Sequence, residues 1–265
     1  MLNKLHHMDA AIGLKQLAGN SIDLIVTSPP YLQMKKSYPG YDSDDYLVWF
    51  LPLAAEMFRA LKDDASFVLN INDGCEDGER STYVFELVLA LKKIGFHYFD
   101  RMVWVKPNGT PTSGKLRRAD YFEYIFQFTK GLNPTFNVDE IRIPYASASL
   151  KRAQSPIKKN VSNKEARTGA SYKKWELHPR GAWPRNTLPF PKDGGKTAHV
   201  APFHIELPSH FIKAHSNSGE TILDPFAGKG TSLRAAQILG RNFIGFEIMQ
   251  EYVMLSKEVY PELWV

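Results

Sequence analysis

The chain has 265 residues, of which 43% are hydrophobic, and carries a net charge of +5 with a pI near 9.1. This length suits one large α/β domain, with or without an insertion, and allows a substantial core. Its apolar runs fall far short of the roughly 18 residues that cross a bilayer. The first residues lack a signal-peptide pattern, and the single cysteine, Cys75, cannot form an internal disulfide. We therefore expect a cytoplasmic protein without membrane spans.

The first zone of the chain, up to about residue 130, alternates strand and helix patterns. Strands are predicted over residues 23–26, 66–71, 98–105 and 121–128, and helices over 46–61 and 83–94. Gly95 follows the second helix, where glycine is common. Strands that alternate with helices predict an α/β fold with a mostly parallel sheet and helices on both of its faces.

A short motif, Thr27-Ser28-Pro29-Pro30-Tyr31, directly follows the first predicted strand. Two prolines end the strand because they fix φ and remove two backbone donors, which leaves the carbonyl oxygens free. A serine hydroxyl beside those carbonyls, with a tyrosine ring next to them, suits an exocyclic amine on a flat ring. In isolation, the tetrapeptide is more often an ordinary strand-ending turn.

The middle zone, residues 131–196, is rich in proline and glycine and has no sustained period, so we expect loops and irregular structure. Residues 151–196 contain 12 Lys or Arg and three acids, a net charge of +9, whereas the rest of the chain has 21 basic and 25 acidic residues, a net charge of −4. A disordered linker is the alternative, but its composition argues against it because aromatic residues interleave with the cations. Such a surface suits phosphates and bases.

In the last zone the α/β pattern returns. We predict helices over 208–214 and 231–239 and strands over 221–223 and 242–245. Between them, residues 224–231 (Asp-Pro-Phe-Ala-Gly-Lys-Gly-Thr) form a strand-to-helix turn in which glycines allow close approach to a ligand. The turn lacks the third glycine of the dinucleotide fingerprint and the ending of a phosphate-binding loop. Glu247, 23 residues after Asp224, can receive the hydroxyls of a ribose, which favours an adenosine-type cofactor.

The two motifs together resemble those of the amino-group DNA methyltransferases, which use S-adenosylmethionine. In that family the catalytic motif is Asp/Asn/Ser-Pro-Pro-Tyr/Phe and the cofactor loop is Asp-Pro-Phe-x-Gly-x-Gly. The order of catalytic motif, basic segment and cofactor loop is similar to that of the β group. The resemblance implies a Rossmann-like methyltransferase fold with a catalytic part at 1–130, a target-recognition insertion at 131–196 and a cofactor-binding part at 197–265.

The resemblance also implies roles for individual residues. The catalytic residues it implies are Ser28, Pro29, Pro30 and Tyr31. The residues it implies for S-adenosylmethionine are Asp9, Thr27, Phe203, Asp224, Pro225, Phe226, Ala227, Gly228, Gly230, Thr231 and Glu247. The candidate DNA contacts are Lys35, Lys36, Arg117, Arg118, Lys158, Lys159, Lys173, Lys174, Arg180 and Arg185. Lys106 is a further candidate for the DNA backbone, with a solvated face as its alternative. No metal site is expected.

The expected reaction is methylation of an exocyclic amine in a base rotated out of double-stranded DNA. Hydrogen bonds from the amine to Ser28 and to the carbonyl of Pro29 would localise the nitrogen lone pair, and Tyr31 would stack on the base. Methylation at cytosine carbon-5 is disfavoured because Cys75 has acids on both sides and no adjacent proline.

The resemblance favours the N4 amine of cytosine, because Ser-Pro-Pro-Tyr accompanies this specificity in most members of the family and Asp-Pro-Pro-Tyr accompanies adenine N6. The alternatives are an adenine-N6 enzyme, a non-catalytic DNA-binding module with the same fold, and an RNA or protein amino-methyltransferase. A cognate restriction endonuclease is a candidate partner. Both a monomer and a homodimer are compatible with the sequence.

Overall fold

The computed structural model describes residues 1–32, 46–76, 78–107, 116–154, 176–191 and 203–264. These residues form two compact units, of which the first comprises Met1–Asn137 and Asn186–Val265 and the second Val138–Arg185. Six of the predicted DNA contacts lie outside the described residues, namely Lys35, Lys36, Lys158, Lys159, Lys173 and Lys174. Among the described residues, no helix has the length and apolar character needed to cross a membrane.

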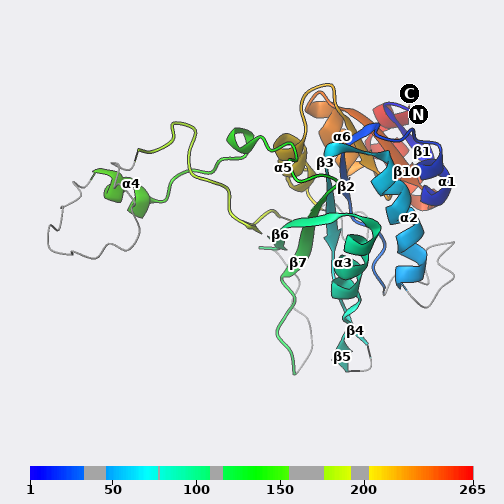
Figure 1. Ribbon diagram of the computed structural model, residues 1–265, viewed down its shortest axis with the longest axis horizontal. Coiled ribbons are helices and arrows are strands. Elements are labelled where there is room, and N and C mark those ends of the chain that lie inside the picture. The colour runs from blue at the N-terminus through cyan, green and yellow to red at the C-terminus, as the bar shows by residue number, and fades with distance from the viewer. Residues whose placement is uncertain (33–45, 77, 108–115, 155–175, 192–202, 265) are drawn as a thin grey trace. The chain divides into compact units, whose positions relative to one another are not determined.

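The first unit is built on an eight-stranded sheet with the strand order β1-β10-β9-β2-β3-β7-β6-β8 (Figure 1). In that order the strands are β1 (Lys4–His7), β10 (Asn242–Glu247), β9 (Thr221–Asp224), β2 (Ile22–Thr27), β3 (Leu61–Ile71), β7 (Phe122–Thr129), β6 (His97–Val105) and β8 (Thr187–Leu188). Of these described strands, only β7 runs antiparallel to its neighbours; the other pairings are parallel. The prediction of a mostly parallel α/β sheet is confirmed.

Helices cover both faces of this sheet. One face carries α1 (Ala10–Lys15), α2 (Tyr46–Ala60) and α3 (Tyr83–Ile94), whose buried side chains share one core cluster. The other carries α5 (Glu206–His215) and α6 (Thr231–Ile238), whose buried side chains belong to a second cluster. The chain then continues through α7 (Gln250–Val259) to a final 3-10 turn, Pro261–Trp264.

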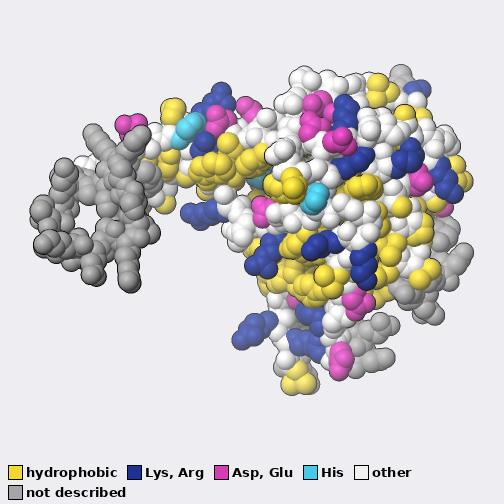
Figure 2. Space-filling view, in the orientation of Figure 1, with side chains coloured by type: hydrophobic (Ala, Val, Ile, Leu, Met, Phe, Trp, Pro, Cys, Tyr) yellow, Lys and Arg dark blue, Asp and Glu magenta, His cyan; other side chains and the backbone are white. Residues whose placement is uncertain are grey.

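The face that carries α3 also exposes apolar side chains beside Lys and Arg (Figure 2). Phe85 and Leu89 of α3 are 50% and 61% exposed, and together with Tyr98 of β6 and Tyr124 of β7 they line a surface groove. The helix therefore covers this end of the sheet only in part. A small hairpin, β4 (Cys75–Glu76) with β5 (Glu79–Arg80), follows β3 before α3 begins.

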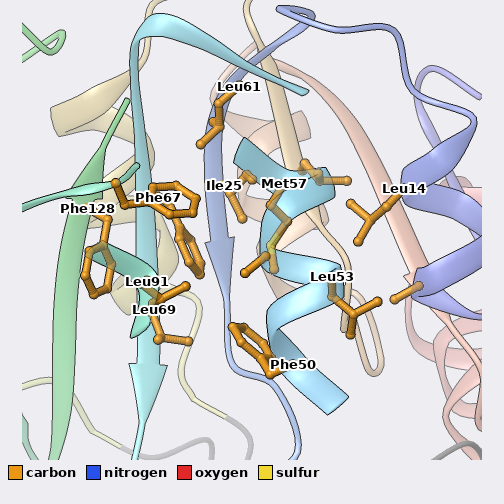
Figure 3. Packing of buried hydrophobic residues seen from close by; sticks show 14 of the residues in the cluster. Leu14, Ile25, Phe50, Leu53, Met57, Leu61, Phe67, Leu69, Leu91 and Phe128 are labelled. Carbon is orange, nitrogen blue, oxygen red and sulfur yellow. The ribbon is translucent and has the colours of Figure 1, made fainter. Parts of the chain in front are cut away.

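Buried strands carry apolar residues on both faces because each face is covered by helices. Leu24 and Val26 of β2 pack into the cluster with α5 and α6, whereas Ile25 packs into the cluster with α2. Figure 3 shows Ile25 near Phe50 and Met57 of α2. This two-sided burial holds β2, and the motif that follows it, at the centre of the sheet.

Several elements differ from the sequence predictions. β3 begins at Leu61, five residues earlier than predicted, in a polar stretch. The predictions missed β1, α1 and α7, because β1 is an edge strand in which only Leu5 is buried and α7 buries only Val253 and Ser256. Periodicity is weak where so little of an element is buried.

The second unit contains more regular structure than predicted. Residues Ser147–Gln154 form the helix α4, although the sequence indicated irregular structure there. Ile143 and Ala182 form an antiparallel bridge with N–O distances of 3.1 and 2.8 Å. Gly181 has φ +113°, and a Cβ atom there would lie 2.4 Å from the carbonyl oxygen of Ile143, so this position requires glycine. The bridge therefore closes a defined loop.

Candidate active site

The two sequence motifs meet at the carboxyl edge of the sheet. From β2 the chain proceeds to β3 on one side, and from β9 it proceeds to β10 on the other, so the connections diverge between β2 and β9. Open α/β sheets bind ligands at such a switch point. Thr27 Oγ1 donates a 2.6 Å hydrogen bond to Asp224 Oδ1, although the two residues are 197 positions apart in the sequence. The motifs are therefore directly joined.

Asp224 organises the glycine-rich loop. Its buried carboxylate accepts hydrogen bonds from the hydroxyls of Thr27 and Ser232 and, at 3.1 Å, from the backbone N–H of Phe226. Burial raises the pKa of Asp224 to about 6, even though these donors oppose the shift. Because its oxygens are occupied by the protein, Asp224 acts with Thr27 and Ser232 to shape the loop.

The loop itself places backbone donors at Glu247. Gly228 and Gly230 have φ values of +54° and +90°, and a Cβ atom at Gly230 would lie 2.5 Å from Leu263 Cδ1. The N–H groups of Gly228 and Met249 donate to Glu247 at 2.8 and 2.7 Å. Burial raises the pKa of the Glu247 carboxyl to about 7. Ala227 and Thr231, on either side of the glycines, are buried.

A pocket lies beside this loop, with an empty volume of about 680 Å³ including its solvent-facing space. Ligand pockets commonly measure about 300–1,000 Å³. The residues that line it are Met8, Asp9, Ala10, Ala11, Pro30, Trp49, Pro52, Leu53, Pro225, Phe226, Phe246, Glu247 and Ile248. Flat and aliphatic side chains beside a carboxylate fit an adenosine group, with the ring between apolar surfaces and the ribose hydroxyls donating to Glu247.

Of the residues predicted to hold the cofactor, the pocket brings together Asp9, Pro225, Phe226 and Glu247. Asp9 also caps α1, because its Oδ1 accepts a 2.6 Å hydrogen bond from the N–H of Ala11. Phe203 is not among the lining residues and packs against the core cluster of α5 and α6. The sequence had not singled out Trp49 and Ile248, which line the same pocket.

The Ser-Pro-Pro-Tyr turn follows β2 at the same edge. Pro29 and Pro30 are buried, whereas Ser28 and Tyr31 are half-buried. The Ser28 hydroxyl lies 3.2 Å from the Tyr31 hydroxyl, which donates a 2.6 Å hydrogen bond to Glu123 Oε2. Burial, and next the charge of Glu123, raise the pKa of Tyr31 well above its ordinary value, so the phenol keeps its proton. The ring is thus anchored at its hydroxyl end.

Three further buried polar residues surround this turn. Asn70 of β3 donates to Glu123 Oε2 at 2.6 Å and to the Tyr31 hydroxyl at 2.9 Å, and Lys106 forms an ion pair with Glu123 Oε1. Lys106, expected at the DNA backbone or on a solvated face, is only 7% exposed, so that expectation is wrong. Its partner is the buried Glu123, whose attraction compensates for desolvation of the ammonium.

Sequence reasoning missed Asn70 and Glu123. The available signal was a single polar residue in an apolar strand, as in Val68-Leu69-Asn70-Ile71 and Tyr121-Phe122-Glu123-Tyr124. Within the described part of the chain, Asn70 Oδ1 is a buried acceptor without a hydrogen-bond partner. Such buried polar groups are rare and commonly mark a functional site.

The predicted DNA contacts that the structure describes have different surroundings. Arg117 is exposed and donates to Cys75 Sγ at 2.8 Å and to the carbonyl of Gly78, so it ties its segment to the β4–β5 hairpin. Arg118 and Arg185 are exposed. In the second unit, Arg180 pairs with Glu140 at 3.4 Å, which reduces the charge it can offer to a phosphate.

No group of three or more His, Cys, Asp or Glu side chains among the described residues is placed to hold a metal ion. A mostly parallel sheet whose switch point joins a glycine-rich loop, a ribose-type acid and a Ser-Pro-Pro-Tyr turn defines the S-adenosylmethionine-dependent methyltransferase fold. The family described as DNA methylase (N6_N4_Mtase) matches residues 22–258. The chain therefore belongs to the N6/N4 DNA methylase family.

Individual relatives agree with this assignment. The chain is 28% identical to Type II methyltransferase M.PvuII of Proteus hauseri, over 92% of this chain and 79% of the relative. It is 30% identical to Type II methyltransferase M1.MboII of Moraxella bovis, over 99% and 98%.

Solved structures show the same fold. PvuII DNA methyltransferase (cytosine-N4-specific) superimposes with a TM-score of 0.73 at 23% identity, over 95% of this chain and 84% of that one. TTHA0409, a DNA modification methylase from Thermus thermophilus in complex with S-adenosyl-L-methionine, superimposes with a TM-score of 0.63 at 25% identity, over 98% and 94%.

Proposed function

We propose that this protein is a site-specific DNA methyltransferase that transfers the methyl group of S-adenosylmethionine to the N4 amine of cytosine. The observation that carries the proposal is the 2.6 Å hydrogen bond between Thr27 and Asp224, which fixes a Ser-Pro-Pro-Tyr turn beside a pocket suited to adenosine. A related structure in complex with S-adenosyl-L-methionine supports the choice of cofactor.

Glu247 and the apolar walls formed by Trp49, Phe226 and Ile248 would hold the cofactor. When bound, S-adenosylmethionine supplies an electrophilic methyl group on a sulfonium. The predicted roles of Asp9 toward the cofactor, and of Thr27, Asp224, Ala227, Gly228, Gly230 and Thr231 in shaping its loop, are part of this proposal. Phe203 is retained only as a neighbour of this region.

The turn prepares the amine for attack. The exocyclic nitrogen of cytosine is a weak nucleophile because its lone pair is delocalised into the ring. Hydrogen bonds from its two N–H groups to Ser28 Oγ and to the carbonyl oxygen of Pro29 would favour a pyramidal nitrogen with a localised lone pair. The two prolines fix that carbonyl before reaction. The nitrogen gains a bond to the methyl carbon and then releases one proton to water.

The target base must leave the DNA stack to reach this turn. Stacking of the base on Tyr31 stays a prediction, and the hydrogen bond from its hydroxyl to Glu123 would hold the ring in one orientation. The basic middle segment is proposed to recognise the target, with phosphate contacts positioning the protein and a few side chains reading bases. Arg117, Arg118 and Arg185 are exposed candidates for the phosphates.

Cytosine is proposed on the strength of Ser28 and of the likeness to the cytosine-N4-specific PvuII enzyme. Adenine N6 is the alternative because the matching family contains both specificities. The deciding experiment incubates long unmethylated duplex DNA of mixed sequence with the purified protein and methyl-labelled S-adenosylmethionine, digests the DNA to nucleosides and identifies the labelled nucleoside.

We expect label in N4-methylcytosine and a loss of about 10²-fold or more in the rate constant for the Ser28→Ala variant. Label found only in N6-methyladenine would overturn the choice of base. Full activity of the Ser28→Ala variant would overturn the catalytic role of the turn. Absence of both DNA methylation and cofactor binding would instead favour a non-catalytic module.

A further inference from the structure

The polar residues beneath the catalytic turn form a hydrogen-bond chain with a fixed direction. It runs from Lys106, which follows β6, through Glu123 of β7 and Tyr31 to Ser28. β7 runs antiparallel to β3 and β6, so its beginning lies at the edge where those strands end. Strands far apart in the sequence therefore bring these four side chains together.

The chemistry of the members sets the direction. An ammonium group only donates, and an ionised carboxylate only accepts. At 2.6 Å from Glu123 Oε2, the Tyr31 hydroxyl must use its single proton toward Glu123. In the 3.2 Å contact with Ser28, Tyr31 can then only accept, so the proton of the Ser28 hydroxyl points at Tyr31.

Asn70 reinforces this direction. Its amide nitrogen donates to Glu123 at 2.6 Å and to the Tyr31 hydroxyl at 2.9 Å, and its contact with Ser28 Oγ, at 3.3 Å, is the longest of the three. An amide group has two hydrogens, and the two shorter bonds use them. Ser28 therefore keeps lone-pair capacity on the oxygen whose proton is already committed to Tyr31.

We propose that Glu123, paired with Lys106, is the positioning residue that presents Ser28 to the target amine as a hydrogen-bond acceptor. This inference rests on the proposed function. A serine hydroxyl in isolation can equally donate, and a donor facing the amine would repel its N–H groups. The buried carboxylate removes this ambiguity from a distance of two hydrogen bonds. The raised pKa of Tyr31 agrees with the direction because the phenol keeps the proton it donates.

The test is a Glu123→Gln variant, in which the amide can donate to Tyr31 and reverse the chain. We expect kcat to fall about 10²-fold, while the dissociation constant for S-adenosylmethionine and the KM for DNA stay within about threefold. Glu258→Gln is the matched control, since Glu258 is exposed on α7, and it should retain full activity.

A double-mutant cycle separates transmission through Tyr31 from a structural effect. Because Tyr31→Phe removes the link between Glu123 and Ser28, Glu123→Gln should cause less than about twofold further loss of kcat in that background. Equal losses in both backgrounds would overturn the proposal, as would full activity of Glu123→Gln beside an impaired Ser28→Ala variant.

The Glu123→Gln change leaves Lys106 buried without its partner. If that variant does not fold, Lys106→Met combined with Glu123→Gln removes the unpaired charge, and the same loss of kcat is expected because the amide is still present. Thermal unfolding and cofactor binding monitor the fold of each variant. Failure of the wild-type protein to methylate DNA would count against the proposed function, whereas the pattern among the Glu123 variants decides this inference.

Discussion

The two halves of the sheet edge bury an acid in different ways. On the cofactor side, Asp224 is surrounded by neutral donors, the hydroxyls of Thr27 and Ser232 and one backbone N–H. On the catalytic side, Glu123 faces the ammonium of Lys106 and accepts from neutral donors on its other oxygen. Both carboxylates are nearly inaccessible, with exposures of 1% and 2% for the two residues.

The difference shows how burial is matched to task. Neutral donors tie the loop at Asp224 together without a second buried charge, and burial there dominates the pKa, which rises to about 6. The ion pair at Glu123 adds a charge that specifies which way hydrogen bonds run. Shaping a loop needs acceptors, whereas presenting a hydroxyl in one orientation also needs a direction. Variants at each side can test this distinction.

The largest effect is expected for Lys106→Met, which leaves Glu123 buried beside an apolar side chain. We predict a loss of about 3–5 kcal/mol in the free energy of unfolding, measured by urea denaturation. Addition of Glu123→Gln should recover most of this loss, because the unpaired charge is then gone. If Lys106→Met has near wild-type stability, the ion pair does not hold the catalytic half together.

A smaller effect, on pH dependence, is expected at the cofactor side. The pKa of Glu247 is raised in the fold to about 7, from an ordinary value of 4.5. Between these values the folded state binds more protons than the unfolded state, so the stability of the cofactor-free protein should fall as pH rises from about 4.5 to 7. Asp224, raised from 3.8 to about 6, contributes in the same direction at lower pH.

The Glu247→Gln variant should lose the part of this decline between about pH 6 and 7 and keep the part due to Asp224. Unfolding free energies at a series of pH values from 4.5 to 8 measure both profiles. Identical slopes for the variant and the wild type would show that Glu247 titrates alike in the folded and unfolded chain.

The smallest effect is expected for Lys62→Met. Lys62 pairs with Asp23 at 2.6 Å, but its side chain is 42% exposed, and Asp23 also accepts a 2.9 Å hydrogen bond from the N–H of Thr221. A solvent-exposed pair contributes about 1 kcal/mol or less. Urea denaturation should therefore separate this variant clearly from Lys106→Met. A loss as large as that of Lys106→Met would mean that burial does not explain the difference between the pairs.

The sequence by itself determined the alternation of strands and helices and the two motifs, because both are local. Apolar periodicity places Tyr83–Ile94 in a helix, and paired prolines or glycines impose turn geometry on their own residues. The family resemblance followed from the order of those motifs along the chain. Edge elements such as β1 and α7 escaped because their few buried residues leave no period.

Only the tertiary structure decided what surrounds each motif. Glu123 and Lys106 are far from Ser28 in the sequence, and an antiparallel strand in a mostly parallel sheet brings them beneath it. A lone Asn or Glu in an apolar strand gives no sign of its partner, and Lys106 read as a surface cation. Burial and hydrogen-bond direction depend on atoms from distant segments, so local sequence does not contain them.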